Sequence, residues 1–183
     1  AEADTALRAA TRVTFDRIDS DGCMSTNDTV ILMASGASGV GPDLEAFTDA
    51  LTQVCGSLAR QLLGDAEGSS HDIAVTVVNA ATEDDAVDVA RCVTRSNLFK
   101  TAIFGNDPNW GRVLASAGTS RATFDPDRVS VSFNGVKVFD TGALGEDRSL
   151  VDLTDREVLV EIDLAAGPAT ATVWTNDLTY DYV

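Results

Sequence analysis

The stretch of sequence that decides the fold is residues 73–93, IAVTVVNAATEDDAVDVARCV. Its first part, Ile73–Val78, is a short run rich in β-branched residues, which is typical of a buried strand. Thr82 and Asp85 then resemble a capping box, which predicts a helix that continues through Val93. A strand followed at once by a helix indicates an α/β layer.

The residues before this stretch predict a second, longer helix. Pro42 suits a first helical position, and apolar residues recur every three or four positions as far as Leu62. Gly64 then ends this helix as a left-handed cap. Nearer the N-terminus, we predict an amphipathic helix over residues 3–18 and a short buried strand over Thr29–Ala34.

The residues that follow predict one more strand and one more helix. Leu98–Phe104 is an apolar run that we expect to form a strand ending at Gly105. Asp107 and Pro108 resemble an N-cap followed by a proline at the first helical position, which predicts a short helix over Asn109–Ala117.

The pattern in the last third of the chain predicts β-hairpins. Val129–Phe133 and Val136–Phe139 flank Asn134-Gly135, the strongest short hairpin signal that a sequence offers. A second hairpin is expected to join Val158–Ile162 to Ala171–Val173 across Gly167-Pro168. We therefore predict an α/β part over residues 1–119 and a β-rich lobe over residues 120–183, with a soft boundary and a shared core.

The charge of the chain excludes several classes of partner. The 183 residues carry a formal net charge of -16, from 13 Lys and Arg against 29 Asp and Glu. Nucleic acid and anionic lipid need clustered basic side chains, so neither is expected to bind. No apolar run is long enough for a membrane span, and the acidic N-terminus is unlike a signal peptide. We expect a cytoplasmic protein whose cysteines are reduced and lie in apolar surroundings (Cys23, Cys55 and Cys92).

The common catalytic and metal-binding motifs do not occur in the sequence. There is no GxGxxG, phosphate loop, HExxH or GxSxG, and no CxxC pair. His71 is the only histidine, and its polar surroundings predict a solvated side chain in a turn. Cys55 lies on the apolar stripe of its helix, which indicates packing. We therefore expect no metal and no cofactor.

Three segments are unusual for their position. Ser25–Thr29 places five polar residues against a predicted strand, where they either satisfy loop amides or line a pocket. Asp65-Ala66-Glu67-Gly68 places carboxylates beside a helix C-terminus, where the helix dipole disfavours them, so Glu67 is either solvated or bound to a substrate ammonium. Asn106–Arg112 combines a cap, an aromatic ring and a guanidinium, which favours a structural joint with Arg112 paired to a buried acid.

Together these segments resemble one family. Asp21–Thr29, Asp65–Gly68, Lys100–Ala102, Asp107–Arg112 and Thr175–Val183, in this order, are closely similar to the bifunctional ornithine acetyltransferases of arginine biosynthesis, also called glutamate N-acetyltransferases. The resemblance covers essentially the whole chain, and the sequence is most similar to those of actinobacterial members.

The resemblance implies that this sequence is most of a β chain. In the family a precursor cleaves itself before a threonine, which becomes the N-terminal nucleophile of the β chain. That threonine and a C-terminal tail are expected outside this sequence. The oxyanion donors are expected on the companion α chain. An αββα sandwich completed by the α chain, and an α2β2 assembly, are implied as well.

The implied reaction is acetyl transfer by double displacement. The threonine takes the acetyl group from N-acetylornithine, and glutamate then accepts it, with no cofactor or metal; some members also use acetyl-CoA. Glu67 matches the family's substrate-binding glutamate, and no catalytic residue is expected within this chain. Thr26 and Asn27 are candidates only for the pocket floor.

Two other readings remain open. A self-processing amidase or aminopeptidase of the same architecture would release its acyl group to water, so glutamate would not accelerate it. A non-catalytic acidic subunit that binds a partner would show neither self-cleavage nor an acyl adduct.

Overall fold

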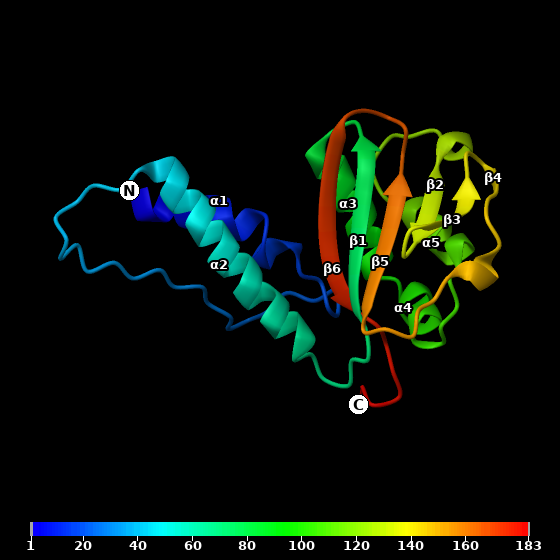
Figure 1. The fold of residues 1–183 in the computed structure, drawn as a ribbon, viewed down its shortest axis with the longest axis horizontal. Helices are drawn as coiled ribbons and strands as arrows, with labels where there is room; N and C mark the ends of the chain where they lie inside the picture. Colours follow the sequence, from blue (N-terminus) through cyan, green and yellow to red (C-terminus); the bar gives the residue numbers. More distant parts are fainter. Residues whose placement is uncertain (1, 183) are drawn as a thin grey trace.

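The computed structural model of the chain describes residues 2–182. Ala1, the first residue of the predicted α/β part, and Val183, the last residue of the predicted β-rich lobe, lie outside the described residues. A six-stranded mixed sheet forms the body, helices cover one face of it, and a two-helix arm projects from one edge (Figure 1). The predicted α/β class is confirmed. Within residues 2–182, no helix is both long enough and apolar enough to cross a membrane.

The central strand of the sheet is β1 (Asp72–Ala80), the strand predicted over Ile73–Val78. It pairs in parallel with β5 (Glu157–Asp163) on one side and antiparallel with β6 (Ala169–Asn176) on the other. Beyond β5 lie β2 (Ser130–Phe133), β3 (Val136–Asp140) and β4 (Ala143–Leu144), which gives the order β4-β3-β2-β5-β1-β6.

The first predicted hairpin is confirmed, and the second is wrong. Asn134 and Gly135 take positive φ angles of 46° and 85° in the tight turn between β2 and β3. In contrast, β5 and β6 do not pair, because β1 lies between them. Gly167 crosses over the end of β1, where a Cβ would lie 2.6 Å from the Ala80 carbonyl oxygen. The glycine therefore serves a close crossover, which local sequence cannot distinguish from a hairpin turn.

The predicted boundary near residue 120 divides segments that share one sheet. The strand β1 comes from the first part of the chain, and both of its neighbours come from the second part. The shared core includes residues of both parts, among them Val75, Val89, Phe133 and Ile162. The division into an α/β part and a β-rich lobe remains a prediction.

Three helices cover one face of the sheet. They are α3 (Glu83–Thr94), α4 (Asn97–Phe104) and α5 (Trp110–Ala117). Thr82 is confirmed as the N-cap of α3, since its hydroxyl accepts a hydrogen bond from the Asp85 amide at 3.1 Å. The Asp85 carboxylate bonds to the Thr82 hydroxyl at 2.8 Å, where a complete capping box would bond to the Thr82 backbone amide. The buried residues Val89, Val93 and Val113 of these helices pack with the sheet in the main core.

The strand predicted over Leu98–Phe104 is wrong, because this run forms α4. The Ser96 hydroxyl accepts a hydrogen bond from the Phe99 amide at 3.3 Å and so starts the helix. A short apolar run fits the side-chain period of a strand as well as that of a helix, and here the N-cap bond selects the helix. The next helix also begins later than expected: its N-cap is Asn109, and not Asp107.

The arm consists of α1 (Glu2–Arg12), the short 3-10 helix η1 (Phe15–Arg17) and α2 (Leu44–Gly64). The helix predicted over residues 3–18 is therefore divided. The two helices α1 and α2 pack against each other, and the small side chains of Ala6 and Ala10 in α1 and of Ala59 in α2 are buried. Gly64 is the last residue of α2 and not a left-handed cap; the positive φ angle, 66°, occurs at Gly68.

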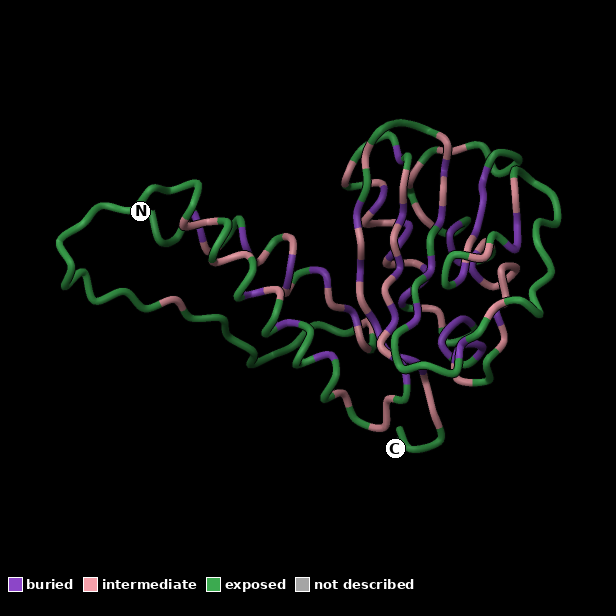
Figure 2. The backbone as a smooth tube through the Cα atoms, viewed as in Figure 1, coloured by how far each residue is buried: buried purple, intermediate pink, exposed green. Residues whose placement is uncertain are grey.

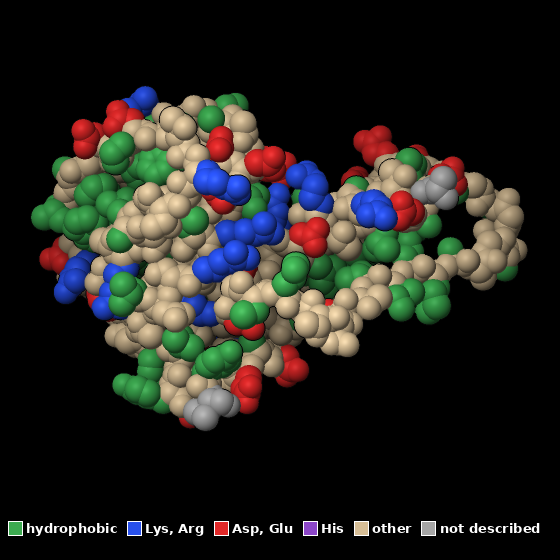
Figure 3. Space-filling view, turned by 180° about the vertical axis from the view of Figure 1, so that it is seen from behind, with side chains coloured by type: hydrophobic (Ala, Val, Ile, Leu, Met, Phe, Trp, Pro, Cys, Tyr) green, Lys and Arg blue, Asp and Glu red, His purple; other side chains and the backbone are tan. Residues whose placement is uncertain are grey.

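Arginine side chains fasten the arm to the helices of the body, and Figure 3 shows Lys and Arg gathered where the arm meets the body. Arg17 and Arg12 both bind Glu83 of α3, at 2.7 and 3.0 Å. In the opposite direction, Arg91 of α3 donates to the carbonyl of Asp16 at 2.6 Å.

A long segment between η1 and α2 contains no helix or strand. We call residues 22–43 the open segment; Figure 2 shows it as almost continuously exposed. The buried strand predicted over Thr29–Ala34 is wrong for this structure, since Ile31 is 72% and Met33 is 88% exposed. A strand needs a neighbour with which to share hydrogen bonds, and the described residues provide none here.

The cysteines differ in exposure. Cys55 is buried in α2, which confirms its predicted packing role, whereas Cys23 is exposed in the open segment and Cys92 is half-buried. The expectation of apolar surroundings is therefore wrong for Cys23.

Candidate functional site

Glu67 lies at the tip of a tight turn between α2 and β1. We call residues 65–70 the Glu67 turn. Within it the Ser69 amide donates to the Ala66 carbonyl at 3.2 Å. The Glu67 side chain is exposed, and among residues 2–182 it has no hydrogen-bond or ion-pair partner. The structure therefore presents a free carboxylate that can bind a cation.

The C-terminal end of α2, just before this turn, is capped by side chains from distant strands. Asn176 donates from Nδ2 to the Leu63 carbonyl at 2.9 Å, and Arg156 donates from Nη2 to the Gly64 carbonyl at 2.8 Å. Arg156 is itself held by two bonds of 3.0 Å to Asp72. The guanidinium satisfies a terminal carbonyl and offsets the helix dipole, which makes an acidic turn acceptable here.

The segment after β6 closes over the Glu67 turn. The Thr179 hydroxyl donates to the carbonyl of Gly68, and a Cβ on Gly68 would lie 2.6 Å from the carbonyl carbon of Asp181. With its positive φ angle, this position accepts only glycine without strain. The turn is thus fixed on both sides by parts of the chain about one hundred residues away, as Figure 1 shows near the C-terminus.

His71 is a buried structural residue, so the prediction of a solvated histidine is wrong. It is 7% exposed; its Nδ1 lies 2.7 Å from Asp177 Oδ2, and its Nε2 lies 3.0 Å from the Leu153 carbonyl oxygen. The Ser70 hydroxyl also contacts Nδ1, at 3.0 Å, and the Asp177 carboxylate. A serine nucleophile needs the histidine nitrogen that does not bind the aspartate, and here a carbonyl occupies that nitrogen.

Asp177 is the anchor of this arrangement. Its Oδ1 accepts hydrogen bonds from the amides of Ser70 and His71, both at 2.9 Å. Burial raises the pKa of the carboxyl group, but the bonds from Ser70 and His71 outweigh burial, and the pKa lies below its ordinary value. The sequence analysis missed this role; the only signal was that Asp177 belongs to one of the family-like motifs.

Lys100 is a buried lysine of α4. Its Nζ donates to the carbonyl of Ser20. Burial lowers the pKa of its ammonium group, and the carboxylates of Asp19, Asp21 and Asp177 oppose this shift. Lys100 belongs to a motif that the resemblance used, but its burial could not be read from a run that was expected to be a strand.

The Ser25–Thr29 segment forms its own local turn. The Ser25 hydroxyl accepts hydrogen bonds from the amides of Asn27 at 3.2 Å and Asp28 at 3.0 Å, and the Thr26 hydroxyl donates to the Asn27 side chain. Among residues 2–182, none of these side chains bonds to the Glu67 turn. A role for Thr26 and Asn27 in a pocket floor remains a prediction.

The Asn106–Arg112 segment is a joint between helices. Arg112 donates from Nη1 to the Leu98 carbonyl and to Thr101 Oγ1, so its predicted pairing with a buried acid is wrong. The acid of the segment, Asp107, instead pairs with Arg148 at 3.4 Å. Trp110 stacks on Phe139, with ring centroids 4.6 Å apart. The segment therefore fixes α4 and α5 against the sheet.

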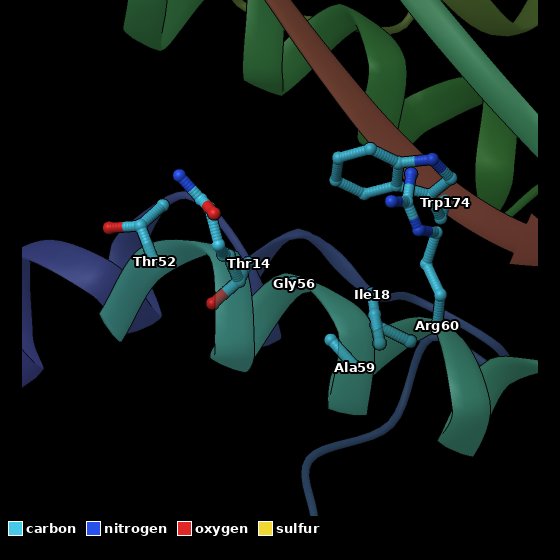
Figure 4. Close-up of a pocket in the computed structure, with 8 residues that line it drawn as sticks. Thr14, Ile18, Thr52, Gly56, Ala59, Arg60 and Trp174 are labelled. Carbon is cyan, nitrogen blue, oxygen red and sulfur yellow. The ribbon is translucent and has the colours of Figure 1, made fainter. Parts of the chain in front are cut away.

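A small cavity of about 180 Å³ lies between α2 and β6. Figure 4 shows Arg60 of α2 and the ring of Trp174 at one end of it. The hydroxyls of Thr14 and Thr52 are already bonded to helix carbonyls at 2.7 Å. The eight lining residues include no carboxylate, thiol or imidazole, so they supply no general base. Among the described residues, no group of three or more His, Cys, Asp and Glu side chains is placed to hold a metal ion.

Comparisons with known proteins agree on one family. A family model described as "ArgJ family" matches residues 1–183. The arginine biosynthesis bifunctional protein ArgJ of Streptomyces coelicolor is 64% identical over 180 residues, which are 98% of this chain and 47% of that protein. The protein of the same name from Thermobifida fusca is 61% identical over 97% of this chain and 46% of its own length. The chain thus spans about half the length of these curated relatives.

A solved structure has the same fold. The crystal structure of arginine biosynthesis bifunctional protein argJ from Bacillus halodurans superposes with a TM-score of 0.91 at 35% sequence identity. The match covers 98% of this chain and 89% of that one. The arm, the open segment and the Glu67 turn therefore belong to a fold that an experimental structure shares.

Proposed function

Because the chain belongs to the ArgJ family, we propose that it is part of an enzyme that transfers an acetyl group from N-acetylornithine to glutamate. The products are ornithine and N-acetylglutamate, and the acyltransferase serves arginine biosynthesis in the cytoplasm. The names of the curated relatives support this pathway.

The observation that carries the proposal within this chain is the free carboxylate of Glu67. The side chain is exposed, unpaired among the described residues and mounted on a turn that Arg156, Asp177 and Thr179 hold. A fixed carboxylate binds an ammonium group without first having to be ordered. N-acetylornithine carries one free ammonium, on the side chain or at the α position according to which amine is acetylated.

The proposed mechanism is double displacement at a threonine outside this sequence. The threonine hydroxyl attacks the acetyl carbonyl and its proton passes to the α-amine of the same threonine; the α-ammonium then gives this proton to the leaving nitrogen as the amide C–N bond breaks and ornithine is released. The amine of glutamate then attacks the acetyl-threonine ester, the ester C–O bond breaks, a proton from the attacking amine restores the threonine hydroxyl by way of the α-amine, and N-acetylglutamate leaves. Oxyanion donors on the companion chain stabilise both tetrahedral intermediates. Acetyl-CoA would form the same acyl-enzyme where it serves as a donor.

We also propose that a companion α chain from the same precursor covers the exposed apolar surface, and that two pairs assemble as α2β2. One face of α2 carries three exposed apolar side chains at spacings of four residues, Val54, Leu58 and Leu62. Ile31 and Met33 of the open segment are exposed as well. The curated relatives are about twice as long as this chain, so the missing half can supply the cover. In that assembly Thr29–Ala34 would gain a strand neighbour and complete an αββα sandwich.

The first experiment is intact mass spectrometry of the full-length gene product after brief exposure to N-acetylornithine. We expect two chains, with an acetyl increment on the chain that contains these residues, and loss of the increment when glutamate is added. A single uncut chain without an adduct would contradict the proposal and favour a partner-binding subunit. An adduct that discharges equally fast without glutamate would favour a self-processing amidase.

The role of Glu67 is tested by Glu67→Ala in the assembled enzyme. We expect a KM for N-acetylornithine raised about tenfold or more, because a charged hydrogen bond to the ammonium is lost, with little change in thermal unfolding. Asp65→Ala is the matched control, since Asp65 is an exposed acid of the same turn that uses its backbone amide and not its carboxylate. Equal KM values for the two variants would remove Glu67 from the site.

A further inference from the structure

His71 is the only histidine of the chain, and the proposed chemistry assigns its ring no task. It lies directly after the Glu67 turn, at the start of β1, and it is buried. Its Nδ1 is 2.7 Å from Asp177 Oδ2, and its Nε2 is 3.0 Å from the carbonyl oxygen of Leu153. The ring therefore connects the base of the Glu67 turn with the segment before β5 and with the segment after β6.

Both ring nitrogens face oxygen atoms that accept hydrogen bonds. A carbonyl oxygen is only an acceptor, so Nε2 must carry a hydrogen to bond to Leu153. A neutral imidazole has a single N–H, and its other nitrogen is an acceptor. With the hydrogen on Nε2 alone, the lone pair of Nδ1 would face a carboxylate oxygen of Asp177. Both contacts are favourable together only when the ring is an imidazolium ion.

A proton on Asp177 instead of the ring is disfavoured by the other bonds of this carboxylate. Its Oδ1 accepts from the amides of Ser70 and His71, and its Oδ2 accepts the single hydrogen of the Ser70 hydroxyl. Such bonds stabilise the charged form of a carboxyl group, and the pKa of Asp177 lies below its ordinary value. The proton between the two side chains therefore belongs to the ring.

Burial of Asp177 favours the same assignment. Its side chain is 0% exposed, and a buried carboxylate is costly without an opposite charge beside it. Among residues 2–182, the ion-pair partner of this carboxylate is His71. An imidazolium ion makes the buried pair neutral as a whole, whereas a neutral ring would leave the negative charge of the aspartate uncompensated.

The charged groups of the neighbouring elements do not take the place of His71. In β1, the carboxylate of Asp72 is bound by Arg156 at 3.0 Å. In α4, Lys100 donates to a backbone carbonyl. In the segment just before β5, the carboxylates are exposed. Within the described residues, neither Arg156 nor Lys100 has a hydrogen bond or ion pair with Asp177, so the ring supplies the direct positive contact.

The pair of His71 and Asp177 also holds the backbone beside Glu67. Asp177 Oδ1 accepts both amides at the base of the turn, at 2.9 Å each. The ring fixes the orientation of the same carboxylate through Oδ2, and Leu153 fixes the ring from its other side. A carboxylate that loses this contact is free to turn, and it takes with it the amide of Ser70, in the turn that carries Glu67.

We propose that His71 is a positioning residue for the Glu67 carboxylate, and that it acts as an imidazolium ion which donates to Asp177 and to the carbonyl of Leu153. The inference rests on the proposed function, because the quantity that His71 controls is the binding of N-acetylornithine by Glu67. The ring does not touch the substrate, since it is buried and protein oxygens occupy both of its nitrogens.

The protonation of the ring is tested by nitrogen NMR of the assembled full-length enzyme, labelled at its histidine side chains. The signals of His71 are those that disappear in His71→Lys. We expect both ring nitrogens to carry a hydrogen at about pH 7.5, where a free imidazole is mostly neutral. A ring with a single N–H would overturn the proposal.

The positioning role is tested by the KM for N-acetylornithine and by kcat, at saturating glutamate. His71→Gln removes the charge and should raise KM about fivefold while kcat changes less than about twofold, because a displaced carboxylate binds the ammonium less well. His71→Lys keeps a cation that can donate to Asp177, so its KM should stay within about twofold of the unaltered enzyme. In a Glu67→Gln background, His71→Gln should raise KM no further, because both changes remove the same interaction.

Arg17→Gln is the matched control, since Arg17 is another buried cation paired with a carboxylate, that of Glu83 at 2.7 Å, and it joins the arm to α3. It should lower stability and leave KM unchanged, as expected of a purely structural cation. If His71→Gln does not fold, His71→Asn takes its place. The asparagine amide can donate to Asp177 but carries no charge, so the same increase in KM is expected.

The outcomes separate this inference from the proposed function. An unchanged KM in His71→Gln, or in His71→Asn where that variant replaces it, overturns the role of His71, while a raised KM in Glu67→Gln leaves the proposed function standing. A KM raised as much by His71→Lys as by His71→Gln also overturns the inference. An unchanged KM in Glu67→Gln overturns the binding role of Glu67 and the positioning role built on it, whatever the ring nitrogens carry.

Discussion

The Glu67 turn and the Ser25–Thr29 segment look alike in sequence, since both are short, polar and adjacent to an apolar run, but they are held in opposite ways. The Glu67 turn is fixed by Arg156, Asp177 and Thr179, which all lie far away in the chain. In the part of the chain that the structure describes, the side chains of the Ser25–Thr29 segment bond only within the segment. The first region is preorganised within this chain, whereas the second has the exposure expected of a surface that a partner completes.

The largest effect is expected when the anchor of the Glu67 turn is removed. Asp177→Ala leaves the amides of Ser70 and His71 and the His71 ring without their acceptor. We expect about 3–5 kcal/mol less free energy of unfolding, measured by denaturant titration of the assembled enzyme.

Asp181→Ala is the control for this variant, because Asp181 lies in the same segment and is exposed. It should change stability by less than about 0.5 kcal/mol. Equal stability of the two variants would show that the segment, and not the Asp177 carboxylate, holds the turn.

A second comparison uses two glycines with nearly the same backbone angle. Gly68 has φ 66° and Gly36, in the open segment, has φ 68°, but only at Gly68 would a Cβ meet another part of the chain, at 2.6 Å. Gly36→Ala should cost about 1 kcal/mol of strain. Gly68→Ala should cost about 2–3 kcal/mol, because packing strain adds to the backbone strain. It should also raise the KM for N-acetylornithine; equal costs would mean that the close approach does not matter.

The open segment is tested by making it polar. Ile31→Ser with Met33→Ser should leave the fold of this chain unchanged, since both side chains are exposed in it. It should weaken association with the companion chain by about 2–4 kcal/mol if both side chains become buried there. Analytical ultracentrifugation over a dilution series measures this loss. Unaltered association would place the companion on another surface.

The smallest expected effect is the pH dependence that Asp177 contributes. Its pKa is lower in the folded protein than the ordinary value of 3.8, so the unfolded chain binds more protons near that pH. The stabilisation is therefore complete above the ordinary value and is lost as the pH falls through the folded value. Unfolding of the assembled enzyme is measured from about pH 6 to about pH 3, the range in which carboxyl groups titrate. Asp177→Asn should make the loss of stability with falling pH less steep, and the rest of the slope comes from other carboxyl groups with lowered pKa values, such as Glu83 and Asp88.

The local features of this protein could be predicted from its sequence. The N-cap at Thr82, the Asn134-Gly135 turn and the strand over Ile73–Val78 all depend on neighbours within a few residues, and the structure contains all three. The α/β class follows from their alternation. The ordered motifs also identified the family and matched Glu67 to its substrate-binding glutamate, a role that remains a prediction.

Which distant segments meet could not be read from the sequence and is seen only in the folded chain. The strand β5 has a side-chain alternation that fits either β6 or β1 as a neighbour, and the crossover at Gly167 selects β1. His71 looked solvated because its burial depends on Asp177, 106 residues away. Lys100 is buried for the same kind of reason, since its ammonium donates to the carbonyl of Ser20, 80 residues away. Long-range pairing leaves no trace in local periodicity, and it is this pairing that holds the Glu67 turn in place.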